Sequence, residues 1–141
     1  MFLGEYSHTI DDKGRLTVPS KFRTDLAVGM VVTRGFDQNL MVYPVPAWQR
    51  LAERILSKPI SDGRVRDFRR LLFSGASDLT QDRQGRVLVP PFLREYAAIK
   101  DEVVIVGMYD HLEIWSAEAW QAQRQRIDHP VGGEQWEDLG I

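Results

Sequence analysis

The sequence contains one pattern twice, and this internal repeat constrains the fold more than any other feature of the chain. Residues 10–20 read Ile-Asp-Asp-Lys-Gly-Arg-Leu-Thr-Val-Pro-Ser, and residues 81–91 read Gln-Asp-Arg-Gln-Gly-Arg-Val-Leu-Val-Pro-Pro, at an offset of 71. Further along, residues 39–43 match 111–115 at an offset of 72. Matches in the same order, with one inserted residue between them, indicate two copies of a module of about fifty residues.

Each copy is rich in short apolar stretches of the kind that form strands, so the repeat predicts a β-rich α+β fold. The expected strands are 7–10, 16–18, 31–33 and 40–43 in the first copy, and 87–89, 103–106 and 112–115 in the second. The expected helices are 20–26 and 61–73, capped by Ser20 and Ser61, together with 47–56 and 117–127. Four short strands and one helix make a thin layer. The two copies are therefore expected to interlock around one core with pseudo-twofold symmetry.

The repeat also predicts how the chain is divided. The expected parts are a first module (1–56), a linking helix (57–75), a second module (76–127) and an acidic tail (128–141). The linking helix carries a broad apolar surface that serves either as core or as a subunit interface. Trp48 and Trp120 occupy equivalent helix positions and are expected to pack in the core, whereas Trp136 in the tail has no clear role.

Charge is distributed unevenly along the chain. Residues 1–75 hold twelve Lys and Arg against eight Asp and Glu, and residues 76–141 hold six against twelve, for a net charge of −2. This balance argues against a broad basic surface but allows a local basic face. No apolar run approaches the roughly 18 residues of a membrane span, and residues 1–8 do not resemble a signal peptide. We therefore expect a cytoplasmic protein with no membrane contact.

The residues needed for catalysis or metal binding are missing or scattered. The chain has no cysteine, which excludes disulfides, Cys-ligated zinc, iron–sulfur clusters and a thiol nucleophile. Its three histidines, His8, His111 and His129, have no metal-ligand spacing. No nucleophile elbow, phosphate-binding loop or dinucleotide fingerprint is present. The prediction is a protein that is not an enzyme and that has no metal and no cofactor.

The strongest local pattern is Asp-x-x-x-Arg, which occurs as Asp11 to Arg15 and as Asp82 to Arg86. Each pattern contains a glycine, Gly14 or Gly85, that suits a tight turn. One interpretation is a salt bridge that holds a hairpin together, worth about 0–1 kcal/mol if exposed. The other is a turn that presents cations outward, where arginine contacts phosphates and reads guanine edges. The cations concerned are Lys13, Arg15, Lys21 and Arg23 in the first copy, and Arg83, Arg86 and Arg94 in the second.

These residues resemble the MraZ family. The resemblance covers residues 1–127 and rests on Met-Phe-Leu-Gly-Glu-Tyr at 1–6, on the doubled Asp-x-x-x-Arg with Gly before the Arg and Pro four residues after it, and on Tyr-Pro-x-x-x-Trp at 43–48. It implies two tandem swapped-hairpin β-barrel modules of the SpoVT-AbrB type with flanking helices. It also implies a homo-oligomeric ring, commonly an octamer.

The resemblance further implies a nucleoid-associated transcriptional regulator, usually a repressor. It would bind direct repeats of double-stranded DNA in the promoter of the division and cell-wall gene cluster. The DNA-contacting arginine of the family falls on Arg15, with Arg86 as its counterpart in the second copy and Lys13 beside it. The second copy departs from the first, with Arg83-Gln84 in place of Asp12-Lys13 and Phe92 in place of Lys21. Equal DNA contacts from both halves are therefore less expected.

A second function class stays open at this stage. Modules of this kind also hold partner proteins through C-terminal segments, so an oligomeric scaffold or antitoxin-like interaction protein is the alternative. DNA binding should depend on Arg15 and weaken steeply with salt. Partner binding should depend instead on the helices and the tail.

Overall fold

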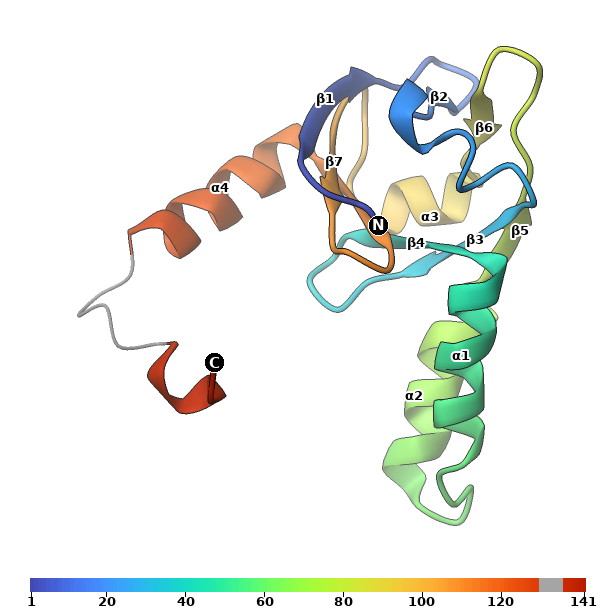
Figure 1. Cartoon of the computed structure of the whole chain (residues 1–141), viewed down its shortest axis with the longest axis vertical. Helices are drawn as coiled ribbons and strands as arrows, with labels where there is room; N and C mark the ends of the chain where they lie inside the picture. Colours follow the sequence, from blue (N-terminus) through green and yellow to red (C-terminus); the bar gives the residue numbers. More distant parts are fainter. Residues whose placement is uncertain (130–135) are drawn as a thin grey trace.

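Both copies form the same series of elements, in the order that the repeat predicts (Figure 1). The computed structural model describes residues 1–129 and 136–141. The first copy contains β1 (Glu5–Thr9), β2 (Arg15–Thr17), the 3₁₀ turn η1 (Ser20–Phe22), β3 (Met30–Arg34), β4 (Leu40–Pro44) and α1 (Val45–Leu56). The connecting helix is α2 (Gly63–Ser74). The second copy contains β5 (Ser77–Leu79), β6 (Arg86–Leu88), α3 (Pro91–Tyr96), β7 (Glu102–Gly107), β8 (Leu112–Ser116) and α4 (Ala117–Asp128), and η2 (Glu137–Leu139) follows. Residues 130–135 of the predicted tail lie outside the described residues.

The two copies exchange strands, which confirms the β-rich α+β fold with two interlocked modules. Six strands form one sheet in the order β1-β7-β8-β4-β3-β5, and β2 pairs with β6 in a separate ribbon. β1 of the first copy pairs with β7 of the second, and β5 of the second copy pairs with β3 of the first. Among the described residues β1 and β5 are the edges of the sheet, so hydrogen bonds do not close it into a barrel.

The strand register locates the pseudo-twofold axis. In the ribbon, Leu16 lies opposite Val87, its equivalent at the offset of 71. In the sheet, Met41 lies opposite Glu113, its equivalent at the offset of 72. Equivalent residues face each other only where a twofold axis passes between them, so the axis runs through the β2–β6 ribbon and the β4–β8 pair.

One apolar core belongs to both copies and lies between the ribbon and the sheet. Its buried side chains include Leu16, Val18, Phe22, Leu40, Val87, Val89, Leu93 and Ile105. Phe22 is 1% exposed and makes edge-to-face contacts with Phe2 and Tyr6, at ring-centroid distances of 5.2 and 5.3 Å. Because both copies contribute to this core, neither could bury it alone, as the sequence predicts.

The helices leave the sheet at two different ends. β4 and β8 are antiparallel neighbours, and each runs directly into a helix. α1 and α4 therefore start at opposite ends of the sheet (Figure 1). α1 packs against α2 over a second, smaller core that contains Met41, Tyr43, Ala47, Ile55 and Leu72. Within the described residues no helix is long and apolar enough to cross a membrane.

Of the two tryptophans at equivalent helix positions, Trp48 packs against the smaller core as predicted, whereas Trp120 is half-buried on α4 and belongs to neither core. The Trp48 ring lies 6.0 Å from Tyr43 and 5.8 Å from Phe73, between centroids. The Trp120 ring lies 5.5 Å from that of Trp115.

Two predicted helix caps are wrong, and one strand was missed. Ser20 makes no capping hydrogen bond, because the backbone N–H of Phe22 donates to the carbonyl of Pro19 and starts a 3₁₀ turn. That turn ends at Phe22, well short of the expected residue 26. In α2 the cap is Asp62 in place of Ser61, and its carboxylate accepts from the backbone N–H of Arg64. β5 was missed because its three residues are held by pairing with β3, not by a local pattern.

Candidate nucleic-acid interface

The two Asp-x-x-x-Arg loops lie together because the strands that follow them pair. Arg15 lies opposite Leu88 in the ribbon, and Thr17 lies opposite Arg86. Each copy also closes the loop of the other. The backbone N–H of Val18 donates to the carbonyl of Gly85 at 2.8 Å, and that of Val89 donates to the carbonyl of Gly14 at 2.9 Å. The loops therefore form one surface, at the top of Figure 1 and away from α1 and α2.

In the first loop the carboxylate of Asp11 fixes both the turn and the arginine. Oδ1 accepts from the backbone N–H groups of Lys13 and Arg15 at 3.0 and 2.8 Å. Oδ2 accepts from Nε of Arg15 at 2.6 Å. The backbone N–H of Gly14 donates to the carbonyl of Asp11 at 3.0 Å and closes the turn. The salt bridge that the sequence suggests is therefore present.

The second loop repeats this geometry. Oδ1 of Asp82 accepts from the backbone N–H groups of Gln84 and Arg86, both at 2.9 Å. Oδ2 accepts from Nε of Arg86, also at 2.9 Å. The same bonds around both aspartates show that the repeat in the sequence is a repeat of side-chain geometry.

Both arginines remain available to a ligand although they are paired. The side chains of Arg15 and Arg86 are 37% and 32% exposed. Only Nε of each guanidinium is bonded to its aspartate, and neither Nη atom donates to any residue that the structure describes. An arginine has five N–H donors in a rigid fork. Each loop therefore presents a guanidinium group with four free N–H donors. The carboxylate of the aspartate holds this group in place through its Nε.

Strand alternation places the two arginines on the outer face of the ribbon. Leu16 and Val87 are buried against the core, so the residues on either side of them point the other way. The outward residues are Arg15, Thr17, Arg86 and Leu88. Sequence reasoning missed Thr17 and Leu88, although the alternation from Arg15 would have identified Thr17.

The glycines of the two turns accommodate arginines from the opposite copy. Gly14 and Gly85 have φ angles of +87° and +75°, a region that favours glycine. A Cβ on Gly14 would lie 2.7 Å from Cζ of Arg94, and one on Gly85 would meet the side chain of Arg23. Any larger residue would therefore be strained and would also displace an arginine.

This packing corrects the prediction that Arg23 and Arg94 present their charge outward. Both are half-buried, and their Nε atoms donate to the carbonyls of Val18 and Val89 at 3.0 and 3.1 Å. They brace the loop of the opposite copy. The sequence shows only that both arginines have the same spacing after the loop in the two copies, and this spacing is equally compatible with a brace and with an outward cation.

The other three predicted cations are exposed. Lys13 lies in the first loop, directly before Gly14, and Arg83 lies in the second loop, two residues before Gly85. Lys21 lies in η1, and its ammonium lies 5.9 Å from the ring centroid of Tyr6 and 5.8 Å from that of Phe22. None of these three forms an ion pair with a residue that the structure describes. In the described part of the chain no group of three His, Cys, Asp or Glu side chains could hold a metal ion.

The aspartates of both loops have lowered pKa values. The main cause is the backbone N–H of Arg15 for Asp11 and of Arg86 for Asp82, which bonds the charged carboxylate, and the guanidinium adds to the effect. A carboxyl group whose pKa is lower in the folded state stabilises the fold above the pKa of the unfolded chain. That contribution is lost as the pH falls through the folded pKa.

We expect the Asp11→Asn variant to be less stable than the native protein at pH 7, and the difference to shrink as the pH falls below about 4. The difference begins to shrink there because the unfolded chain takes up the proton first, and it disappears once the pH is below the lowered pKa of folded Asp11, where both proteins carry an uncharged side chain in the loop. Urea unfolding at pH 3 and pH 7 measures the difference, and Asp82→Asn provides the matched variant in the second loop. A difference that stays constant with pH would contradict the role given to the carboxylate.

The fold and this surface define a class of protein, a single chain with two swapped-hairpin modules whose paired loops expose arginines on the pseudo-twofold axis. Comparison with known proteins agrees. The family model described as "MraZ protein, putative antitoxin-like" matches residues 1–71 and again residues 72–131. The chain belongs to the MraZ family.

Curated relatives are similar over nearly their whole length. The chain is 59% identical to a transcriptional regulator MraZ of Herpetosiphon aurantiacus over 121 residues, 86% of this chain and 85% of the relative. It is 54% identical to one of Roseiflexus castenholzii over 128 residues, 91% and 90% of the two chains. It is 46% identical to one of Halothermothrix orenii over 143 residues, the full length of both. These relatives are regulators of transcription, so the chain has a regulatory and not an enzymatic role.

Proposed function

We propose that this chain is a sequence-specific DNA-binding repressor that acts on direct repeats in the promoter of the division and cell-wall gene cluster. The single observation that carries the proposal is the β2–β6 ribbon with Arg15 and Arg86 on its outer face. Arg15 is the principal contact, and Arg86 its counterpart. Lys13, Arg83 and Lys21 supply nearby charge, and Asp11, Gly14, Asp82 and Gly85 shape the loops. In this role the protein is cytoplasmic and associated with the nucleoid.

A two-stranded ribbon matches the shape of double-stranded DNA. The major groove of B-DNA admits such a ribbon, and an arginine there can donate two hydrogen bonds to O6 and N7 of one guanine. Each such pair contributes about 1–3 kcal/mol of discrimination against the wrong base. The aspartate on Nε holds the guanidinium before DNA arrives, so little side-chain entropy is lost on binding. In this proposal the salt bridge and the outward cation are therefore not alternatives, because the salt bridge orients the same arginine that contacts DNA.

Two arginines per chain make few contacts, which supports an oligomeric ring, commonly an octamer in this family, as the active form. Linked sites act at effective concentrations of order millimolar, and this raises avidity by roughly 10² to 10⁴. Direct repeats in the promoter supply several sites for one ring. As part of the proposal we retain the division into modules 1–56 and 76–127, a linking helix 57–75 and an acidic tail 128–141.

Fluorescence anisotropy with the promoter upstream of the protein's own gene tests the proposal. We expect the native repeats to bind about 10³-fold or more tightly than a shuffled duplex of the same length. We also expect the logarithm of the affinity to fall linearly with the logarithm of salt concentration, by about 0.9 for each phosphate contact. Equal, weak binding to both duplexes would overturn the proposal and favour the scaffold or antitoxin-like alternative.

A further inference from the structure

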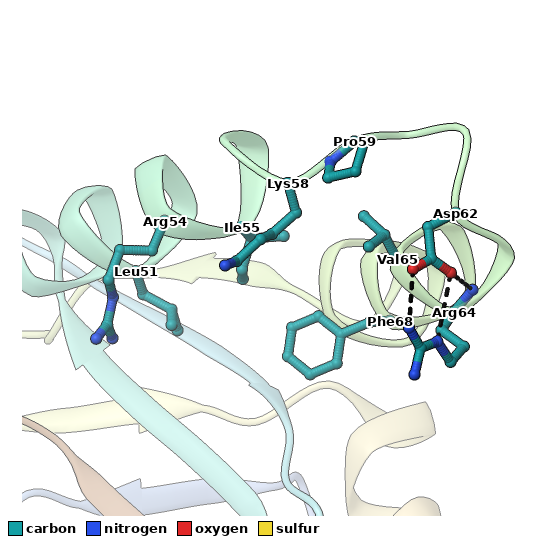
Figure 2. A pocket seen from close by; sticks show the side chains of 9 residues that line it. All are labelled: Leu51, Arg54, Ile55, Lys58, Pro59, Asp62, Arg64, Val65 and Phe68. Atoms are coloured by element: carbon teal, nitrogen blue, oxygen red, sulfur yellow. Dashed lines mark hydrogen bonds and ion pairs between the residues drawn. The ribbon is translucent and has the colours of Figure 1, made fainter.

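A groove between α1 and α2 is unused by the proposed DNA contact. It has a volume of about 600 Å³ and lies on the helical arm, far from the ribbon (Figures 1 and 2). Its lining is mainly apolar. The lining residues are Leu51, Ile55, Val65 and Phe68, with Arg54, Lys58 and the Asp62–Arg64 pair around them. Figure 2 shows the Phe68 ring inside the groove, between the two helices.

The rim of this groove carries unneutralised positive charge. Asp62 and Arg64 neutralise each other, because Nε and Nη2 of the guanidinium donate to the carboxylate at 3.4 and 3.1 Å. Arg54 and Lys58 are exposed and form no ion pair with any residue that the structure describes. An apolar floor with two free cations on its rim suits a ligand that is apolar on one side and acidic on the other.

The last six residues of the chain have that character. Trp136, Leu139 and Ile141 are 50%, 60% and 104% exposed, and Glu137 and Asp138 stand between the first two. Because η2 is a 3₁₀ turn, residues three positions apart lie on the same side of it, so Trp136 and Leu139 share one side. Tryptophan is among the residues that most often anchor a protein interface, and here it forms part of an exposed apolar surface.

We propose that the α1–α2 groove of one subunit receives residues 136–141 of a second copy of this chain. Trp136 and Leu139 would enter the apolar groove, and Glu137 and Asp138 would meet Arg54 and Lys58. A second copy is the favoured source because α4, which leads to the tail, leaves the sheet at the end opposite to α1.

The contact is heterologous, with different surfaces on the two subunits, and heterologous contacts build a ring when the rotation between subunits closes. The inference therefore rests on the oligomeric part of the proposed function and names its interface.

Because the chain has no cysteine, engineered disulfides give a direct test. Two full-length variants, Val65→Cys in the groove and Leu139→Cys in the tail, are mixed in equal amounts and oxidised. We expect a disulfide-linked dimer in the mixture at ten times or more the yield of either variant alone. No excess in the mixture would overturn the proposal. A disulfide within single chains of the Val65→Cys and Leu139→Cys double variant, with none in the mixture, would overturn the choice of a second copy.

Charge exchange separates the proposed contact from chance collisions. Arg54→Glu with Lys58→Glu should lower the cross-linking yield about tenfold. Adding Glu137→Lys and Asp138→Lys to the tail partner should restore it. The control is Arg66→Glu with Arg70→Glu, two exposed arginines of α2 that do not line the groove, and it should leave the yield unchanged. Loss of cross-linking that the exchanged tail does not restore would count against the assigned contact.

The test does not involve DNA, so the two proposals fail separately. Cross-linking without preference for promoter repeats would leave the interface standing and overturn the DNA-binding function. Preference for the repeats without cross-linking would overturn the interface alone.

Discussion

Replacing both Arg15 and Arg86 by alanine should abolish the preference for promoter repeats while the fold is retained. Each arginine that reads a guanine contributes about 1–3 kcal/mol, roughly 5- to 150-fold in affinity, and separate contacts add. We expect Arg15→Ala to have the larger single effect, since the first copy has Lys21 after its loop and the second copy has the uncharged Phe92 at the equivalent position. The fold should survive, because Asp11 keeps its two backbone N–H donors after the guanidinium is removed.

The measurement is anisotropy with native and shuffled duplexes, alongside light scattering to confirm that the assembly is intact. Arg15→Lys keeps the charge but loses the two-pronged contact, so it should keep the weak binding and lose the preference. Arg70→Ala is the matched control, because Arg70 is 69% exposed, is also paired with an aspartate, and lies on α2. Full preference in the double variant would show that the two Asp–Arg pairs only brace the loops.

Replacing Phe22 by alanine should lower the free energy of unfolding by about 3–5 kcal/mol. The side chain is 1% exposed and packs edge-to-face on Phe2 and Tyr6, so its removal leaves a cavity in the core that both copies share. The cavity would lie at η1, whose last residue is Phe22 and which follows β2 after two residues. Urea unfolding followed by tryptophan fluorescence measures the loss.

Phe92→Ala is the control for this prediction. Phe92 is 44% exposed and lies in α3, the counterpart of η1 in the second copy. A surface change of this kind should alter the free energy of unfolding by no more than about 0.5 kcal/mol. Equal losses in the two variants would mean that the shared core does not depend on Phe22 as the structure indicates.

Much of the candidate site could be predicted from the sequence because its parts are local. Asp11 and Arg15 are four residues apart around a glycine turn, so their contact depends on one loop and survives any arrangement of the rest. The same holds for Asp82 and Arg86. Strands and long helices were also predicted close to their true bounds, since they depend on the periodicity of nearby residues. Short features held by distant contacts, such as β5, were missed for the opposite reason.

The sequence by itself determined the twofold plan, since two equivalent modules with thin cores must share one. It also determined the two loops with their arginines. Only the tertiary structure decided that β1 and β5 exchange between the copies, that Arg15 and Arg86 share the outer face of one ribbon, and that Arg23 and Arg94 brace the opposite loop instead of facing outward. Strand partners and side-chain exposure depend on which surfaces bury the most apolar area together. That choice joins residues more than forty positions apart, and no local pattern in the chain encodes it.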